Sequence, residues 1–173
     1  MILFVRHGQT NCNVQKILQG QLDEALNSKG IEQSEETAEK LKSEKIDVIY
    51  CSPLIRARLT ADIINKYHDV EIIEDERLLE QNAGDATGRQ EDTITKEEFD
   101  DFMADPHKYN AESFQDLYDR NIDFFKEIEN SDKNILIVSH SGVWKMLYRY
   151  VHGLSIDDKV ESIGNGEVKI LKN

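Results

Sequence analysis

Two histidines and two arginines stand at the ends of short apolar runs of the sequence. Arg6 and His7 follow the opening run MILFV. His140 follows the run NILIVS, and Arg56 comes shortly after the run IDVIY. Taken singly, a histidine at such a place is usually a hydrogen-bonded structural residue, and an arginine is usually a solvated surface group. Taken together, two imidazoles and two guanidiniums repel one another unless an anion is bound, so they predict a phosphate or carboxylate site.

The elements that must position these residues alternate along the chain. Apolar runs predict strands at 1–5, 46–50, 70–73, 134–139 and 167–171. Amphipathic spacing predicts helices at 28–44, 52–67 and 143–151, with further helices that begin after Thr95 and Ser113. This alternation predicts an α/β fold, a three-layer sandwich with a mainly parallel central sheet flanked by helices on both faces. Ligands bind at the carboxyl ends of such strands, so we expect the four residues to meet at one edge of the sheet.

Local signals predict where the helices begin and which residues they bury. Ser52-Pro53 is expected to start one helix, because proline lacks a donor that the first turn does not use. Thr95 with Glu98 matches a capping box, which predicts a short helix in an acidic part of the chain. An apolar stripe is expected behind the helix start at Ser113, made of Phe114, Leu117, Phe124, Phe125 and Ile128.

Composition limits the classes of function. The chain has 173 residues, of which 39% are hydrophobic, and this predicts one domain over residues 1–173. A net charge of −13 argues against nucleic acid or anionic membrane as a partner and leaves small molecules. No apolar run is long enough for a membrane span, and no signal peptide is expected. Cys12 and Cys51 lack the paired spacing of a zinc site, so we expect free thiols and a cytoplasmic protein.

An ordered series of motifs resembles the histidine phosphatase superfamily, also called phosphoglycerate-mutase-like proteins. The series spans roughly residues 3 to 150. Its stations are Arg6-His7-Gly8-Gln9-Thr10 with Asn13 and Gly20, Ser52-Pro53-Leu54 with Arg56-Ala57, Leu79-Glu80, Glu112-Ser113, and Val138-Ser139-His140 with Gly142. Agreement at this many stations, in order, is far more specific than the Arg-His-Gly triplet alone.

The resemblance implies a role for each residue of the expected cluster. His7 is implied as the nucleophile that attacks phosphorus and becomes a phosphohistidine. Arg6, Arg56 and His140 are implied to hold the phosphoryl oxygens, with Asn13 as a further donor. The fixed cations take the place of a metal, so no metal and no cofactor is expected.

Glu80 matches the acid of the family, which protonates the leaving oxygen and then takes a proton from the attacking water. Some relatives carry an acidic residue directly after the second histidine, but Ser141 stands there in this chain, which favours Glu80. The alternative for Glu80 is an ordinary solvated carboxylate. The chain also departs from the family pattern, for example with Ala86 where an aromatic residue is frequent, and this affects the expected substrate pocket.

Three functions fit the resemblance. The first is a phosphomonoesterase that acts on a small phosphorylated metabolite. The second is a cofactor-dependent phosphoglycerate mutase, and the third is a catalytically silent relative that binds phosphorylated ligands. Residues 85–111 are expected to form a lid or insertion over the active site, and 91–105 carry seven carboxylates and one lysine. This acidic stretch would hold a doubly anionic ligand poorly, which favours the phosphatase. The natural substrate and the oligomeric state stay open.

Overall fold

Five apolar runs pair into one sheet with the order β3-β2-β4-β1-β5 in a computed structural model that describes all residues from Met1 to Asn173. The strands are β1 (Ile2–Arg6), β2 (Val48–Cys51), β3 (Ile72–Glu74), β4 (Ile135–Ser139) and β5 (Val168–Lys172). The first four run parallel to their neighbours, and β5 pairs antiparallel with β1. The predicted α/β sandwich with a mainly parallel sheet is confirmed.

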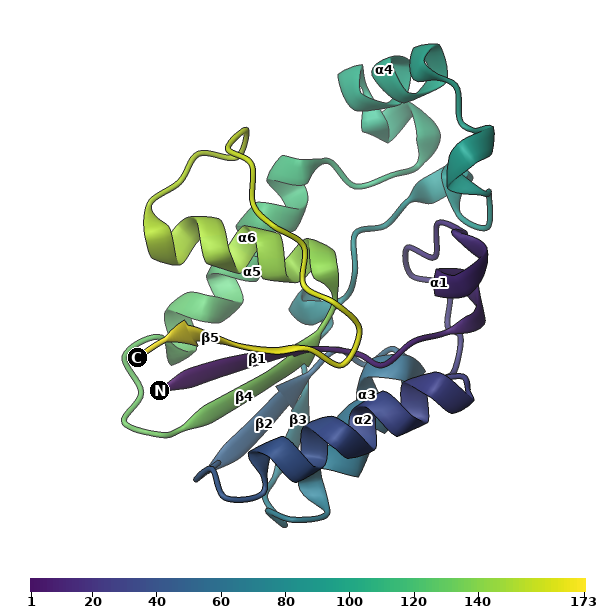
Figure 1. Cartoon of the computed structure of the whole chain (residues 1–173). Coiled ribbons are helices and arrows are strands. Elements are labelled where there is room, and N and C mark those ends of the chain that lie inside the picture. Colours follow the sequence, from purple (N-terminus) through teal and green to yellow (C-terminus); the bar gives the residue numbers. More distant parts are fainter.

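Helices cover both faces of this sheet (Figure 1). One face packs against α2 (Ser28–Leu41) and α3 (Ile55–Asn65), and the other packs against α5 (Phe114–Ile128) and α6 (Ser141–His152). Strand β1 shows the period of two that this sandwich requires. Leu3 and Val5 belong to the core under α2 and α3, whereas Ile2 and Phe4 belong to the core under α5 and α6. None of the helices combines the length and apolarity needed to span a bilayer.

Two of the three predicted helix starts are confirmed. Thr95 and Ser113 are the N-caps of α4 (Lys96–Ala104) and α5, each in a complete capping box. The start at Ser52-Pro53 is wrong, because α3 begins at Ile55 and its N-cap Leu54 has no side-chain cap. Instead, the Asp23 carboxylate accepts a hydrogen bond from the Ile55 amide at 2.7 Å. A residue distant in sequence thus takes the role that sequence proximity suggested for Ser52.

The part of the chain between β3 and α5 consists mainly of short turns. They are η1 (Glu76–Leu78), η2 (Gly84–Ala86), η3 (Glu91–Thr93) and η4 (Pro106–Tyr109), with α4 between the last two. Figure 1 shows α4 projecting away from the sheet on the same side as α1 (Asn11–Gln15). Residues 16–18 and 88–91 are joined by backbone hydrogen bonds around a bridge between Ile17 and Gln90. No side chain from 85 to 110 is buried.

Candidate active site

The register between β1 and β4 brings the two histidines of the sequence motifs together. Arg6 is the partner of Ser139 in this parallel pair, so the next residue of each strand leaves the sheet at the same edge. His7 and His140 are both buried, and their ring centroids lie 5.1 Å apart at an interplanar angle of 60°. The predicted meeting of these two residues at one edge of the sheet therefore occurs.

The hydrogen bond of His7 defines which of its nitrogens can act as a nucleophile. Nδ1 of His7 lies 2.7 Å from the carbonyl oxygen of Gly8. A carbonyl oxygen only accepts, so we assign the proton of a neutral His7 to Nδ1. Its Nε2 then carries the lone pair.

The tautomer of His140 depends on its hydrogen bond with Ser52. Nε2 of His140 lies 2.8 Å from Oγ of Ser52, which also accepts a hydrogen bond from the Leu54 amide at 3.3 Å. We assign the hydroxyl hydrogen of Ser52 to the bond with Nε2, which places the proton of neutral His140 on Nδ1. This Nδ1 is buried and has no hydrogen-bond partner in the protein. An N–H donor is therefore available at the site.

Both imidazoles are held in the neutral form. Burial lowers the pKa of His7 well below its usual value, and the guanidiniums of Arg56 and Arg6 lower it further. Burial is also the main cause that lowers the pKa of His140, followed by Arg56. Neutral His7 retains the lone pair that nucleophilic attack needs.

Two arginines supply positive charge without a carboxylate in direct contact. Arg56 is buried and donates from Nη1 to the carbonyl of Leu22 at 2.7 Å and from Nη2 to that of Gly20 at 2.9 Å. Arg6 donates from Nη1 to the carbonyl of Ile163 at 2.9 Å. The Nε atom of each arginine is buried without a partner. Because buried donors are rarely left unpaired, these N–H groups and Nδ1 of His140 indicate a binding site for an anion.

Glu80 lies between the arginines and the start of α6. Its Oε1 accepts from the Gln81 amide at 2.9 Å, and its Oε2 accepts from the Gly142 amide at 3.3 Å. A Cβ at Gly142 would come within 2.1 Å of Oε1, so the carboxylate occupies space that only glycine leaves free. The charge of Glu80 raises the pKa of both Arg6 and Arg56 against the larger, lowering effect of burial. Glu80 therefore belongs to the same cluster.

Asn13 has its carbonyl oxygen occupied and its amino group free. Oδ1 of Asn13 accepts from the Thr10 amide at 3.1 Å and from Nδ2 of Asn165 at 3.2 Å. These contacts fix the orientation of the side-chain amide. Its Nδ2 has no hydrogen-bond partner within the protein. Asn13 can thus add a neutral donor to the charged ones.

The two cysteines offer no competing nucleophile. Both are free and buried. Burial raises the pKa of the Cys12 thiol to about 11, with a contribution from Glu24, and that of Cys51 to about 12. A thiol that stays protonated is a poor nucleophile. No three His, Cys, Asp or Glu side chains gather closely enough to hold a metal ion.

Comparison with known proteins agrees with this geometry. The sequence profile of the histidine phosphatase superfamily (branch 1) matches residues 2–172. The chain belongs to this superfamily. It is 34% identical to the uncharacterized phosphatase PhoE of Bacillus subtilis over 88% of this chain and 77% of that protein. It is also 34% identical to phosphoglycerate mutase-like protein 4 of Arabidopsis thaliana, over 99% of this chain and 78% of that protein.

The solved structure of Bacillus stearothermophilus YhfR has the same fold. It superposes with a TM-score of 0.85 at 29% sequence identity, and the match covers 96% of this chain and 88% of that one. The protein is accordingly an enzyme of the histidine phosphatase superfamily, and the resemblance predicted from its motifs is confirmed.

The C-terminal loop of this histidine phosphatase contributes residues that sequence reasoning missed. Nδ2 of Asn165 donates to the carbonyl oxygen of His7 at 3.0 Å as well as to Asn13. The Gly166 amide donates to the carbonyl of Arg6 at 3.0 Å, in a turn that Gly166 forms with a φ of 69°. The Gly-Asn-Gly triplet at 164–166 was the available signal, but a turn motif alone does not tell where the turn packs.

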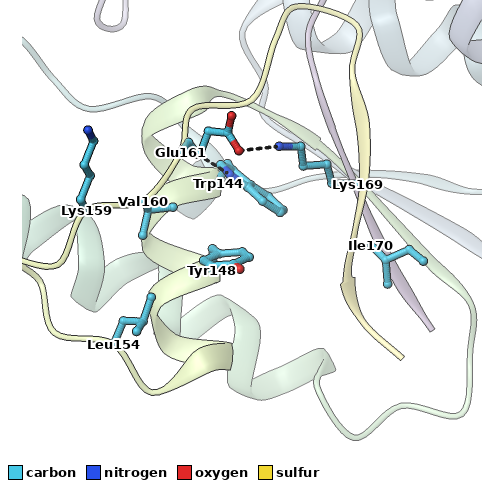
Figure 2. A pocket seen from close by; sticks show the side chains of 8 residues that line it. All are labelled: Trp144, Tyr148, Leu154, Lys159, Val160, Glu161, Lys169 and Ile170. Carbon is cyan, nitrogen blue, oxygen red and sulfur yellow. Dashed lines mark hydrogen bonds and ion pairs between the residues drawn. The ribbon is translucent and has the colours of Figure 1, made fainter.

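Two cavities lie near elements of the sandwich. The larger, about 550 Å³, is lined by Trp144 and Tyr148 of α6 and by Lys169 and Ile170 of β5. Figure 2 shows these side chains around the hollow, and none of the predicted site residues is among the eight that line it. The smaller, about 270 Å³, includes Gln81, the direct neighbour of Glu80. Of these two cavities, the smaller adjoins the site.

Proposed function

We propose that this protein is a metal-independent phosphomonoesterase that hydrolyses a small phosphorylated metabolite through a phosphohistidine on His7. One observation carries the proposal: a neutral imidazole with a free Nε2 lies beside a second neutral imidazole, and the surrounding donors are buried without partners. A phosphoryl group supplies both an electrophilic phosphorus for Nε2 and oxygens for those donors.

In the first step, Nε2 of His7 attacks phosphorus with its lone pair, and the bond from phosphorus to the ester oxygen breaks. Protonated Glu80 gives its proton to that oxygen, so the product leaves as an alcohol. The guanidiniums of Arg6 and Arg56, Nδ1–H of His140 and Nδ2 of Asn13 donate to the three equatorial oxygens, where charge is spread in the transition state. The Gly8 carbonyl stabilises His7 while it bears positive charge.

In the second step, ionised Glu80 accepts a proton from water as the water oxygen attacks phosphorus. The bond between phosphorus and Nε2 breaks, and its electron pair returns to the imidazole. Inorganic phosphate leaves, and Glu80 is protonated again for the next cycle. One carboxyl group thus serves both steps, first as an acid and then as a base.

A phosphoglycerate mutase is the second candidate, because one relative is named phosphoglycerate mutase-like protein 4. A mutase must hold a retained sugar acid by a second anionic group. The 85–111 segment offers Arg89, Lys96 and Lys108 as its cations, and each is paired with a carboxylate. This acidic segment favours water as the acceptor, and the retained His7, Glu80 and arginines argue against a silent relative.

The proposal extends to the domain organisation, the substrate class and the compartment of the protein. We propose that residues 1–173 act as one domain and that residues 85–111 form a lid over the site. A net charge of −13 supports a small phosphorylated metabolite as the partner rather than nucleic acid or membrane. Free, buried Cys12 and Cys51 support a reducing compartment, and hence the cytoplasm.

The test is phosphate release from p-nitrophenyl phosphate and glycerol 1-phosphate in the presence of EDTA. We expect wild type to release phosphate and His7→Ala to lose at least about 10³-fold in kcat, since the nucleophile is gone. His152→Ala, which removes an exposed imidazole at the end of α6 and outside the 85–111 segment, is the matched control. An acid-labile phosphoenzyme in wild type but not in His7→Ala identifies the intermediate. Near-normal activity of His7→Ala would contradict the proposal, and interconversion of phosphoglycerates without phosphate release would favour the mutase.

A further inference from the structure

The smaller cavity, which we call the α4 cavity, lies between α4 and the loops beside Glu80. Its lining includes the large apolar side chains Leu18, Ile94, Phe99, Phe102, Met103 and Phe114. Phe99 and Phe114 are 52% and 41% exposed, and the sequence had placed Phe114 in the apolar stripe of the core. Binding of an apolar group over large, exposed apolar side chains in a pocket is favourable, because it removes their surface from water.

The α4 cavity begins where the leaving group of the proposed reaction must lie. Gln81 lines it, and the Gln81 amide donates to Oε1 of Glu80. Ala83 also lines it and packs against Gly20, whose carbonyl holds Arg56. The ester oxygen has to meet Glu80 to receive a proton, so the group attached to that oxygen extends past Glu80 toward Gln81.

The charges of the α4 cavity oppose a second anion. Arg89 is the one cation in its lining, and its Nη2 lies 3.3 Å from both carboxylate oxygens of Glu98. Asp85, a second carboxylate of the lining, accepts from the neutral amide of Asn110 at 3.0 Å and has no cationic partner. A leaving group with its own carboxylate or phosphate would meet a site of net negative charge.

From these contacts we infer that the α4 cavity selects phosphomonoesters of apolar or aromatic alcohols, and that the Arg89–Glu98 pair excludes leaving groups with a second negative charge. This inference rests on the proposed phosphomonoesterase function and names its substrate class. When the leaving group covers Phe99 and its neighbours, the burial of apolar surface contributes to binding. Because Arg89 is paired with Glu98, it is not available to bind a carboxylate of the substrate.

Three primary alkyl phosphates test the inference, because they share the reacting bond and differ in the leaving group. They are 2-phenylethyl phosphate, glycerol 1-phosphate and 3-phosphoglycerate. We expect wild-type kcat/KM to be highest for the phenylethyl ester, by about tenfold over glycerol 1-phosphate, as burial of part of a phenyl ring provides. We expect 3-phosphoglycerate to be the poorest of the three.

Phe99→Ala tests the apolar half of the inference. It should lower the ratio of kcat/KM for 2-phenylethyl phosphate to that for glycerol 1-phosphate by about fivefold, since part of the covering surface is lost. Ile31→Ala is the matched control, because Ile31 is also an exposed apolar side chain, 47% accessible, but lies on α2. The control should keep the wild-type ratio. An unchanged ratio in Phe99→Ala would overturn the apolar assignment.

Glu98→Gln tests the charged half. Glutamine can still accept from the Thr95 amide and keep the capping box of α4, so the change removes the charge and spares the helix start. The freed Arg89 should raise the ratio of kcat/KM for 3-phosphoglycerate to that for glycerol 1-phosphate by about fivefold. Glu97→Gln makes the same change one residue away, outside the lining, and should leave this ratio as it is.

The outcomes distinguish a wrong substrate class from a wrong phosphomonoesterase function. If wild type hydrolyses all three esters and prefers 3-phosphoglycerate or glycerol 1-phosphate, the substrate class is wrong and the phosphomonoesterase stands. If neither variant changes its ratio, the α4 cavity does not contact the leaving group. If no ester is hydrolysed and no phosphoenzyme forms, the proposed function is wrong, and the inference falls with it.

Discussion

The edge of the sheet and the 85–111 segment differ in how their side chains are held. His7, His140 and Arg56 are buried and fixed by short hydrogen bonds to backbone carbonyls or to a buried hydroxyl. In the segment, no side chain before Ala111 is buried, and exposed ion pairs such as Arg89–Glu98 join its parts. Such pairs contribute only about 0–1 kcal/mol each.

In the proposed reaction, this difference separates the reacting groups from the groups that would contact the rest of the substrate. Attack on phosphorus needs donors and a nucleophile within a few tenths of an ångström of their positions, which a buried strand end provides. Contact with a leaving group needs shape and charge but tolerates adjustment. Substitutions at the edge of the sheet should therefore affect every substrate, and those in the segment should change the preference among substrates.

The largest effect is expected from Glu80→Gln. Glutamine keeps one acceptor oxygen, for either the Gln81 or the Gly142 amide, but has no acidic proton to give to the leaving oxygen. We expect kcat/KM for glycerol 1-phosphate to fall by about 10²–10⁴-fold, and kcat/KM for p-nitrophenyl phosphate to fall much less, because kcat/KM reports the first step and nitrophenolate leaves in that step without a proton. Steady-state kinetics with both esters measures the contrast. Equal losses for the two esters would mean that Glu80 is not the acid.

Stability should distinguish the two regions next. Leu78 is fully buried in the core just before the Glu80 loop, whereas Phe99 is half exposed on α4. Leu78→Ala should lower the free energy of unfolding by about 2–5 kcal/mol, because it leaves a cavity. Phe99→Ala should cost about 0.5 kcal/mol or less. Urea unfolding of both variants measures the difference. Similar losses of unfolding free energy in the two variants would contradict the difference between the two regions.

A smaller effect is expected from Asn165→Ala. The variant loses the hydrogen bonds to the His7 carbonyl and to Asn13, each a net contribution of about 1 kcal/mol. The His7 loop should become less well positioned, so we expect the rate of phosphoenzyme formation to fall about tenfold in rapid-quench experiments. Gln115→Ala removes an exposed amide that contacts Asp119, and it is the control. A normal rate of phosphoenzyme formation in Asn165→Ala would mean that Asn165 does not position His7 for the reaction.

The smallest effect concerns pH. The pKa values of His7 and His140 are lowered in the folded chain by burial and by Arg56, whereas the pKa of a histidine in the unfolded chain is about 6.5. As the pH falls through that value, the unfolded chain takes up protons that the folded chain does not, and the free energy of unfolding decreases. A His7→Gln/His140→Gln variant should lose less stability between about pH 7.5 and 5.5. Parallel curves for the two proteins would contradict the assignment of neutral, buried imidazoles.

Much of the fold could be read from local pattern. Each predicted strand is present with its bounds shifted by no more than two residues, because continuous apolar runs report burial directly. The capping boxes at Thr95 and Ser113 form as predicted, since both partners of a capping box lie within one turn. Gly153 ends α6 in the left-handed conformation, as glycine commonly does at the end of a helix.

The errors occurred where a side chain had a choice between local and distant partners. Ser52 binds His140 rather than capping α3, and Asp23 supplies the cap in its place. Phe114 begins a helix with an apolar stripe but lines the α4 cavity instead of the core. Periodicity cannot distinguish these cases, because a surface pocket and a core select the same apolar side chain.

The sequence by itself determined the order of the elements and the chemical types at the edge of the sheet, since both depend on residue identity and near neighbours. The tertiary structure decided the tautomers of His7 and His140, the anchoring of the His7 loop by Asn165, and the pairing of Arg89 with Glu98. The contacts of His140 with Ser52 and of Asn165 with His7 join residues far apart in the chain. Only folding brings such partners within the short range over which these interactions act.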